Sequence, residues 1–568
     1  MRSPARRPLV LATVMALLLG LVGGPATGVL AAQPPDTRLA GIDVDEATIP
    51  ELQALMNRHR LSSVRLVQFY LHRIRKLDST LNAVITVNPD ALALARAADR
   101  ARRGGDRRPL LGIPVIVKDN VNTTGMPTTA GSWALAGSTP TDAFIVQRLK
   151  TAGAIIIAKA NLSEWANFRS IPSSSGWSGI GGQTNLAQVL DRNPCGSSSG
   201  TAVAVSADLA TVGVGTETDG SIVCPAGATG IVGIKPTVGL LSRAGIIPIS
   251  ADQDTAGPMT RNVTDAAVVL GAMTGIDPDD PATAVQAGHA FTDYRQFLDP
   301  DALDGARIGV WRTGTYDPAV SPEVHAIMNA VVAELEAAGV TVIDEVAVPI
   351  EDAYGPEFTA LLCEFRDDIE AYLTTYTGAG YPQDLEALLE FHEANPDLEG
   401  PWNSAIFELA LETGGRADPA CIEARETANE IARAAVDDTM VEHDLDAIIG
   451  PTNGPAWLTD PVNGDLGGDF SAFVGSSSPA AIAGYAAITV PAGYAGPLPV
   501  GVTFIGGAWD EPDLIGLAYA YEQATGVRRA PTFLPTLGAG ATKAAPGKGP
   551  KADRSARPDG AGRMAPLR

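Results

Sequence analysis

Short apolar runs alternate with amphipathic segments along this chain, and this alternation restricts its possible folds more than any other feature. Residues 110–117 (LLGIPVIV) and 154–158 (AIIIA) are rich in β-branched side chains and have the length of buried strands. Residues 142–152 between them have helical spacing, and further strands are predicted at 210–214 and 230–234. Strands that alternate with helices form a sheet covered on both faces. We expect an α/β fold, a single large domain with a mixed, largely parallel central sheet.

The second half of the chain contains a long segment without strands. Residues 351–440 are acidic and rich in helical patterns, and we interpret them as a helical insertion packed over the sheet. Strand-like apolar runs then return, at residues 445–449, 487–490 and 500–505. Helices are also predicted, over residues 64–77, 91–103 and 508–525. We assign residues 45–535 to this domain.

The two ends of the chain differ from the domain in composition. Arginines precede an apolar run over residues 9–22 and small residues follow it, so residues 1–32 are predicted to be a secretory signal peptide. The run is shorter than the roughly 20 residues that span a membrane, although an uncleaved anchor is the alternative. We expect a secreted protein with no stable membrane association after cleavage. Residues 33–44 form a polar lead-in, and residues 536–568 are expected to be a disordered basic tail.

The charge of the chain excludes several partners. Its formal net charge is −24, and both ends are basic, so the body between them is more acidic still. A strongly acidic body repels nucleic acid and anionic membranes. We therefore expect no nucleic-acid partner, and we interpret the charge as a means of staying soluble outside the cell.

Cysteine and histidine give no sign of a metal site. The four cysteines are Cys195, Cys224, Cys363 and Cys421. They lack CxxC spacing, and an even number in an exported protein permits two disulfides in any of three pairings. Unpaired buried thiols are the alternative. The six histidines show no HExxH pattern, so a metalloprotease is not supported.

One serine-rich stretch, residues 196–200 (GSSSG), matches the GxSxG motif of an α/β-hydrolase nucleophile elbow centred on Ser198. That motif requires a strand immediately before it and a helix after it. A helix is expected over residues 201–207, but residues 188–194 (QVLDRNP) are polar and end in proline, which does not fit a buried strand. An esterase that uses Ser198 with a distant histidine remains an alternative.

Other motifs place this stretch in a different context. Residues 112–120 (GIPVIVKDN), 196–200 and 215–222 (GTETDGSI) resemble, in this order, the motifs of the amidase signature family. Further stretches resemble the same family, at residues 159–164, 233–237, 254–259 and 498–501. The resemblance covers roughly residues 45–530 and implies the amidase signature fold and hydrolysis of an amide bond.

The resemblance implies a role for each matching residue. Ser221 aligns with the nucleophile, Ser197 with a bridging serine that follows a cis peptide bond, and Lys118 with the base. The oxyanion loop of the family corresponds to four backbone N–H groups, those of Thr218, Asp219, Gly220 and Ser221. The reaction implied needs no metal or organic cofactor.

Elementary chemistry supports this relay independently. A serine hydroxyl is a weak nucleophile until a base accepts its proton. A lysine amine is a base only when neutral, so its ordinary pKa of ~10.4 has to fall by several units. Burial of Lys118 at the end of an apolar strand would have this effect, because desolvation penalises the charged form. A hydroxyl both donates and accepts, so Ser197 can pass a proton from Ser221 to Lys118.

Two residues of the third motif depart from the commonest family pattern. Glu217 stands where aspartate is usual and Asp219 where glycine is usual, and the stretch resembles instead the peptide amidase branch. We therefore expect the substrate to be the C-terminal carboxamide of a peptide, with other small aliphatic or aryl amides as the alternative. Amidotransfer onto transfer RNA, a role of some relatives, is not expected of an exported, acidic chain. We expect a monomer.

Overall fold

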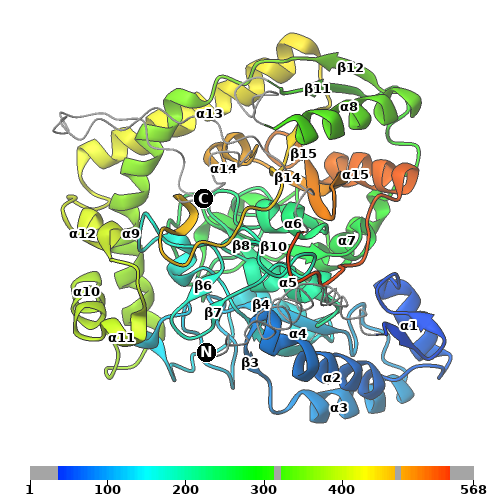
Figure 1. Cartoon of the computed structure of the whole chain (residues 1–568), viewed down its shortest axis with the longest axis horizontal. Coiled ribbons are helices and arrows are strands. Elements are labelled where there is room, and N and C mark those ends of the chain that lie inside the picture. Colours follow the sequence, from blue (N-terminus) through cyan, green and yellow to red (C-terminus); the bar gives the residue numbers. More distant parts are fainter. Residues whose placement is uncertain (1–35, 313–320, 467–474, 538–568) are drawn as a thin grey trace, which may run out of the picture. The chain divides into compact units, whose positions relative to one another are not determined.

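The main sheet of the described residues has eleven strands, several of which are labelled in Figure 1. The computed structural model describes residues 36–312, 321–466 and 475–537. In spatial order the strands are β12 (Thr341–Asp344), β11 (Arg307–Val310), β13 (Ala447–Pro451), β15 (Leu498–Ile505), β14 (Ala487–Ala495), β9 (Val232–Lys235), β10 (Thr255–Thr260), β8 (Val212–Glu217), β4 (Pro114–Lys118), β5 (Ile155–Ala160) and β3 (Val84–Val87). The predicted signal peptide, and the predicted tail from residue 538 onward, lie outside the described residues.

The sheet is mixed, as predicted, but its parallel pairs are a minority. β4 is parallel to β5 and β8, and β11 is parallel to β12 and β13, whereas the other six neighbouring pairs of the described sheet are antiparallel. β14 and β15 form a tight hairpin, and such a turn joins only antiparallel strands. β10 lies antiparallel between β8 and β9. This corrects the expectation of a largely parallel sheet, because an apolar run indicates burial and not direction.

Each strand predicted from an apolar run overlaps a strand of the structure, with shifted ends. β4 begins only at Pro114, because the residues before it turn at Gly112, which has φ +74° and no room for a Cβ beside Ser63. β3, β11 and β12 were not predicted, and each has only four residues. β10 was not predicted either, because it contains glycine and proline.

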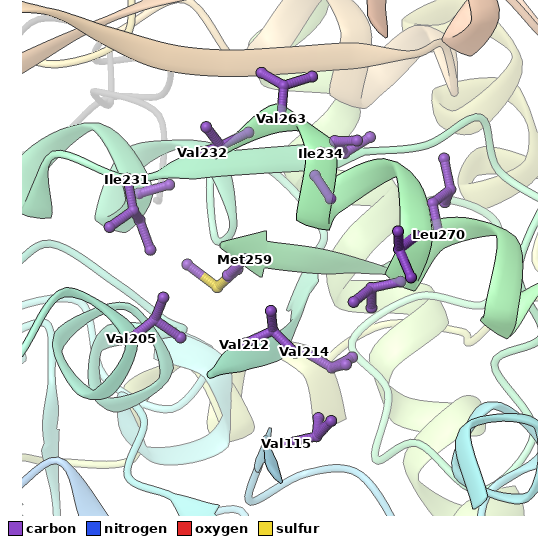
Figure 2. Packing of buried hydrophobic residues seen from close by; sticks show 14 of the residues in the cluster. Val115, Val205, Val212, Val214, Ile231, Val232, Ile234, Met259, Val263 and Leu270 are labelled. Atoms are coloured by element: carbon purple, nitrogen blue, oxygen red, sulfur yellow. The ribbon is translucent and has the colours of Figure 1, made fainter. Parts of the chain in front are cut away.

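Helices cover this sheet and connect its strands. They are α1 (Ile49–Asn57), α2 (Ser63–Leu81), α3 (Ala91–Arg103), α4 (Phe144–Thr151), α5 (Ser199–Ser206), α6 (Val223–Thr229), α7 (Val263–Met273), α8 (Pro322–Ala337), α14 (Ser478–Ala483) and α15 (Glu511–Thr525). α5 and α6 are buried along their whole length and consist mostly of small residues, so they pack closely on each other and on the strands. Valines of α5 and β8 meet Met259 of β10 in the main apolar core, as Figure 2 shows.

Residues 351–440, the predicted insertion, contain helices joined by loops and no strand. The helices are α9 (Tyr354–Tyr376), α10 (Leu385–Ala394), α11 (Pro396–Glu399), α12 (Ala405–Leu411) and α13 (Pro419–His443). Helices α9, α10 and α12 form a second apolar core together with loop residues such as Trp165, Phe168 and Ile249. These three helices therefore pack against loops beside the sheet, while residues of α13 belong to a third apolar core that also contains Ile448 of β13 and Ile505 of β15.

Both cysteine pairs are bonded. Cys195 pairs with Cys224 and Cys363 pairs with Cys421, which selects one of the three pairings that the sequence permitted. The first disulfide lies in the main body and the second joins α9 to α13. Within the described ranges, no helix has both the length and the hydropathy of a membrane span.

Candidate active site

Lys118, Ser197 and Ser221, the residues predicted to act together, lie in contact. The Nζ of Lys118 is 2.7 Å from the Oγ of Ser197, and this oxygen is 2.9 Å from the Oγ of Ser221. Lys118 and Ser197 are fully buried, whereas Ser221 is 4% exposed. The three polar groups thus form a continuous series from a fully buried amine to the hydroxyl of Ser221, which borders a pocket.

The sheet positions Lys118 and Ser221, the first and last residues of this series of contacts. Lys118 is the last residue of β4, which is buried throughout. Ser221 follows β8 after a tight turn at Gly220, whose φ is +78°. A side chain there would strain the backbone and bring a Cβ to 3.0 Å from the hydroxyl of Ser477. Because β4 and β8 are adjacent and parallel, their carboxyl ends bring the amine and the nucleophile loop together.

The serine-rich stretch supplies Ser197, which lies between Lys118 and Ser221. The peptide bond between Gly196 and Ser197 is cis. The backbone N–H of Ser198 donates to the carbonyl oxygen of Ser221 at 3.1 Å and so joins the two serine loops. The hydroxyl of Ser198 is buried and donates to the carbonyl oxygen of Thr216, and no described histidine is its partner. The residues before Ser198 form only isolated β-bridges and not the strand that a nucleophile elbow requires. The geometry therefore does not support an esterase elbow at Ser198.

Neutral oxygens surround the amine of Lys118. Its Nζ lies 3.1 Å from the carbonyl oxygen and 2.9 Å from the hydroxyl of Thr216, and the side-chain amide of Asn120 donates to this hydroxyl. Burial lowers the pKa of Lys118 to about 7, and the charges of Asp254 and Glu217 offset only part of this. A neutral amine can donate to both oxygens of Thr216 and keep its lone pair toward Ser197.

The loop predicted to bind the oxyanion is held by side chains and leaves its N–H groups free. No described residue accepts a hydrogen bond from the backbone N–H groups of residues 218–221. The carboxylate of Asp219 accepts from the hydroxyls of Ser477 and Ser478, at the start of α14. The hydroxyl of Thr218 donates to a buried carboxylate behind the loop. The aspartate that departs from the common family pattern therefore links the loop to a helix.

A buried glutamate, Glu217, holds the turn that contains Ser221. The Oε2 of Glu217 accepts from the backbone N–H groups of Ile222 and Val223, at 2.7 and 3.0 Å. Burial raises the pKa of Glu217, and the charge of Lys235 opposes this rise. Sequence reasoning gave no role to Glu217, Thr216 or Asn120. Only their position inside the motifs could have indicated these residues. Their contacts join segments that are far apart in the sequence, so no local pattern predicts them.

A pocket opens above Ser221. Its lining comes from the nucleophile loop, from two other loops and from the insertion: Ala166, Asn167, Phe168, Thr218, Asp219, Ser221, Ile249 and Leu361. Phe168, Ile249 and Leu361 are members of the second apolar core, so one side of the pocket is apolar. The backbone of residues 165–167 is left-handed, which turns this loop toward the site.

A polar cluster holds that loop against the insertion. Among the described residues, Glu164, His392 and Glu399 have potential metal-ligand atoms within 4.8 Å of one another. However, Arg169 forms an ion pair with Glu164, and the indole N–H of Trp165 donates to Nε2 of His392 at 3.3 Å. Burial lowers the pKa of His392 to about 3, so the ring stays a neutral acceptor. We interpret the cluster as a structural network, because each of its three side chains already has a protein partner: Arg169 for Glu164, Trp165 for His392 and Ser132 for Glu399.

Comparison with known proteins identifies the class of enzyme. The sequence profile of the Amidase family matches residues 65–515. The chain therefore belongs to the amidase signature family, whose members hydrolyse amide bonds.

Individual relatives agree with this assignment. The native peptide amidase from Stenotrophomonas maltophilia superimposes with a TM-score of 0.81 at 48% identity, over 86% of this chain and 99% of that one. The probable amidase of Arabidopsis thaliana is 39% identical over 86% of this chain and 92% of its own length. The putative amidase of Schizosaccharomyces pombe is 36% identical, over 88% of this chain and 88% of its own length.

Proposed function

We propose that this protein is a secreted amidase that removes ammonia from the C-terminal carboxamide of peptides through an acyl-enzyme on Ser221. The observation that carries the proposal is the unbroken chain of contacts from the Nζ of Lys118 through the hydroxyl of Ser197 to that of Ser221. A lysine whose pKa is about 7 can accept a proton near neutral pH, as a general base must.

Acylation begins when the hydroxyl oxygen of Ser221 attacks the carboxamide carbon. Its proton passes to Ser197, and the proton of Ser197 passes to the amine of Lys118. The negative charge that develops on the carbonyl oxygen is stabilised by the free N–H groups of residues 218–221. One such donor is typically worth ~2.7–4 kcal/mol in the transition state. The proton returns through Ser197 to the departing nitrogen, the C–N bond breaks and ammonia leaves.

Deacylation repeats the same steps with water. A water molecule gives its proton through Ser197 to Lys118 and attacks the ester carbon of the acyl-enzyme. The C–O bond to Ser221 then breaks, and the proton returns to the oxygen of Ser221. The products are the free peptide acid and the original enzyme, so no cofactor is consumed.

The walls of the pocket support an apolar residue next to the carboxamide. Phe168, Ile249 and Leu361 line the pocket above the nucleophile. Burying an apolar side chain there stabilises the complex by roughly 25 cal/mol per Å². The similarity to a peptide amidase supports the same substrate class.

The two disulfides support export. Disulfides form and persist in oxidising compartments and are rare where thiols are kept reduced. The bonded pairs Cys195–Cys224 and Cys363–Cys421 therefore agree with a protein that carries a signal peptide.

Ammonia release from a panel of substrates tests the proposed reaction. Purified protein is incubated with peptide amides, free amino-acid amides and anilides, and ammonia or amine is measured. We expect the highest kcat/KM for peptide amides that end in an apolar residue. Ser221→Ala and Lys118→Ala should abolish turnover while Ser198→Ala retains it. Loss of turnover only in Ser198→Ala would contradict the proposed relay and favour the esterase alternative.

Neighbouring leucines on α9 test the role of the pocket wall. Leu361 lines the pocket, whereas Leu362 is similarly buried and does not. We expect Leu361→Ala, which removes three carbon atoms from the wall, to raise KM for apolar peptide amides by roughly tenfold or more, because one methylene in an apolar pocket is already worth about 10-fold. Leu362→Ala should lower stability with little change in KM. Equal KM values for both variants would remove Leu361 from the substrate site.

A further inference from the structure

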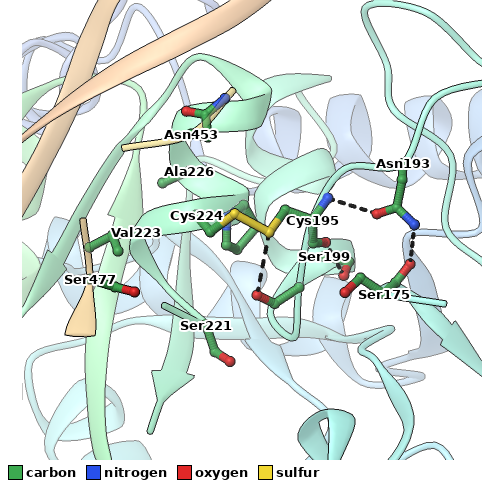
Figure 3. The surroundings of a disulfide bond; sticks show 12 residues. Ser175, Asn193, Cys195, Ser199, Ser221, Val223, Cys224, Ala226, Asn453 and Ser477 are labelled. Atoms are coloured by element: carbon green, nitrogen blue, oxygen red, sulfur yellow. Dashed lines mark hydrogen bonds between the residues drawn. A yellow bond between two sulfur atoms is a disulfide. The ribbon is translucent and has the colours of Figure 1, made fainter. Parts of the chain in front are cut away.

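The disulfide between Cys195 and Cys224 connects the two serine loops of the relay. Cys195 lies two residues before Ser197, and Cys224 lies three residues after Ser221. Figure 3 shows the bond between these loops, with Ser221 and Ser199 close by. Both cysteines are 2% exposed, and they form a small buried cluster with Ala228 and Trp457. Neither cysteine lines the pocket above the nucleophile.

Each cysteine is also tied to its own loop on the far side of the serine. The hydroxyl of Ser199 donates to the carbonyl oxygen of Cys195, so this bond spans Ser197. The backbone N–H of Cys224 donates to the carbonyl oxygen of Gly220 at 2.8 Å, so this bond spans Ser221. Each serine therefore sits inside a small closed loop, and the disulfide joins the two loops.

The packing of α5 on α6 holds the helices that follow the two loops, but few hydrogen bonds join the serine loops themselves. The backbone N–H of Ser198 donates to the carbonyl oxygen of Ser221, and the two serine hydroxyls contact each other. The hydroxyl contact has to break and re-form as protons move, so it cannot hold the loops by itself. The disulfide is the covalent link that persists through the whole cycle.

We propose that the Cys195–Cys224 disulfide is a positioning element of the relay, which keeps the hydroxyl of Ser197 in line with that of Ser221. This inference rests on the proposed function. Opening the bond lowers kcat and leaves KM unchanged, because neither sulfur touches the substrate. A misplacement of about 1 Å in reacting groups can cost 10²-fold in rate, so we expect kcat to fall by roughly 10- to 100-fold.

The second disulfide provides a matched control within the same chain. Cys363–Cys421 joins residues 58 apart in sequence, against 29 for Cys195–Cys224. A cross-link that closes a longer loop removes more entropy from the unfolded chain. Loss of the Cys363–Cys421 bond should therefore destabilise the protein at least as much. It lies between α9 and α13 and contacts no residue of the relay, so kcat should stay within about twofold.

The experiment compares C195S/C224S with C363S/C421S well below the Tm of each. The readouts are kcat and KM for a peptide amide, Tm, and the rate at which a fluorophosphonate labels Ser221. We expect the first pair alone to lose kcat and labelling rate, with KM within about twofold. An unchanged kcat in C195S/C224S, or losses in both pairs that follow Tm, would overturn the proposal.

Two further measurements keep the test decisive. If C195S/C224S does not fold, C195A/C224A avoids burying hydroxyl groups and is assayed in the same way. Alternatively, the folded native enzyme is treated with a dithiol reductant, which is oxidised to its own disulfide as two protein thiols form. Activity that persists after mass spectrometry shows Cys195 and Cys224 to be reduced would overturn the proposal. If no amide is cleaved, the proposed function fails, but the labelling rate of Ser221 still tests the positioning.

Discussion

Two fully buried lysines lie near the carboxyl ends of the neighbouring strands β4 and β5, and among the described residues only Lys159 has an ion-pair partner. β4 and β5 are parallel, and Lys118 pairs with Ala160, the residue after Lys159. The Nζ of Lys159 is 3.0 Å from the carboxylate of Asp119. The Nζ of Lys118 instead contacts two hydroxyls and a carbonyl oxygen, and no described carboxylate forms an ion pair with it.

This difference shows what turns a lysine into a base. Burial lowers the pKa of both side chains, but the adjacent charge of Asp119 opposes the effect for Lys159. Lys159 therefore keeps a contacting partner that stabilises its cation. The contacts of Lys118 are all neutral, and the more distant charges of Asp254 and Glu217 offset only part of the effect of burial, so its pKa falls to about 7. The neighbour, and not the depth of burial, separates a structural cation from a candidate catalytic base.

The distinction between the two lysines would fail if Lys118 were dispensable for catalysis. Lys118→Met keeps the length of the side chain and removes the amine, so we expect kcat to fall by about 10²–10⁴-fold, the usual value of general base catalysis. Steady-state ammonia release measures the loss, and circular dichroism verifies the fold. A variant that keeps a tenth of the wild-type kcat would show that another group accepts the proton.

Lys159→Met should instead act on stability. It leaves the buried carboxylate of Asp119 without its partner, and breaking such a pair typically costs about 3–5 kcal/mol. Urea unfolding of the variant and the wild type gives the difference. The double variant D119N/K159M should recover part of the loss, because neither charge remains. If the single and double variants are equally destabilised, the pair does not set the stability of this site.

Giving Lys118 an acidic neighbour should make it resemble Lys159. Thr216→Asp places a carboxylate where the threonine hydroxyl lies 2.9 Å from the amine. An opposite charge at this distance raises a lysine pKa by about 1–3 units, so activity at pH 7 should fall about tenfold or more and recover at higher pH. Thr216→Asn is the neutral control. Equal pH profiles for the two variants would argue against an electrostatic origin.

The unmodified enzyme should itself show the titration of Lys118. Because the reaction requires neutral Lys118, kcat/KM should fall about tenfold per pH unit below a pKa of about 7. Between this pKa and the ordinary value of ~10.4 the unfolded chain binds the proton and the folded chain does not, so stability rises with pH. Lys118→Met should remove this rise. A flat rate profile between pH 5 and 8 would contradict a neutral lysine base.

The sequence predicted the strands that carry the relay and the motifs that contain it. The apolar runs before Lys118 and in β8 are long enough to indicate buried strands. The order of the strands and their directions depend on contacts between distant segments, and no local pattern contains them. β10, with its glycine and proline, is an inner strand that composition argued against.

The contacts around Lys118, Ser197 and Ser221 could not be predicted from the sequence for the same reason. Thr216 and Asn120 lie inside quoted motifs, but their contact joins residues 96 positions apart. The ion pair of Asp119 and Lys159 depends on the register of β4 against β5, which the sequence does not show. The cysteine pairing was likewise open, because spacing alone permits three arrangements.

The wall of the pocket and the relay are anchored in separate apolar cores. Phe168 and Leu361 belong to the core that the insertion shares with the loops, whereas the strands that hold the amine and the nucleophile belong to the main one. Substitutions in the insertion can therefore reshape what enters the pocket while the reacting groups keep their alignment. Proteins with this architecture can therefore evolve a new substrate range while they keep the same catalytic residues.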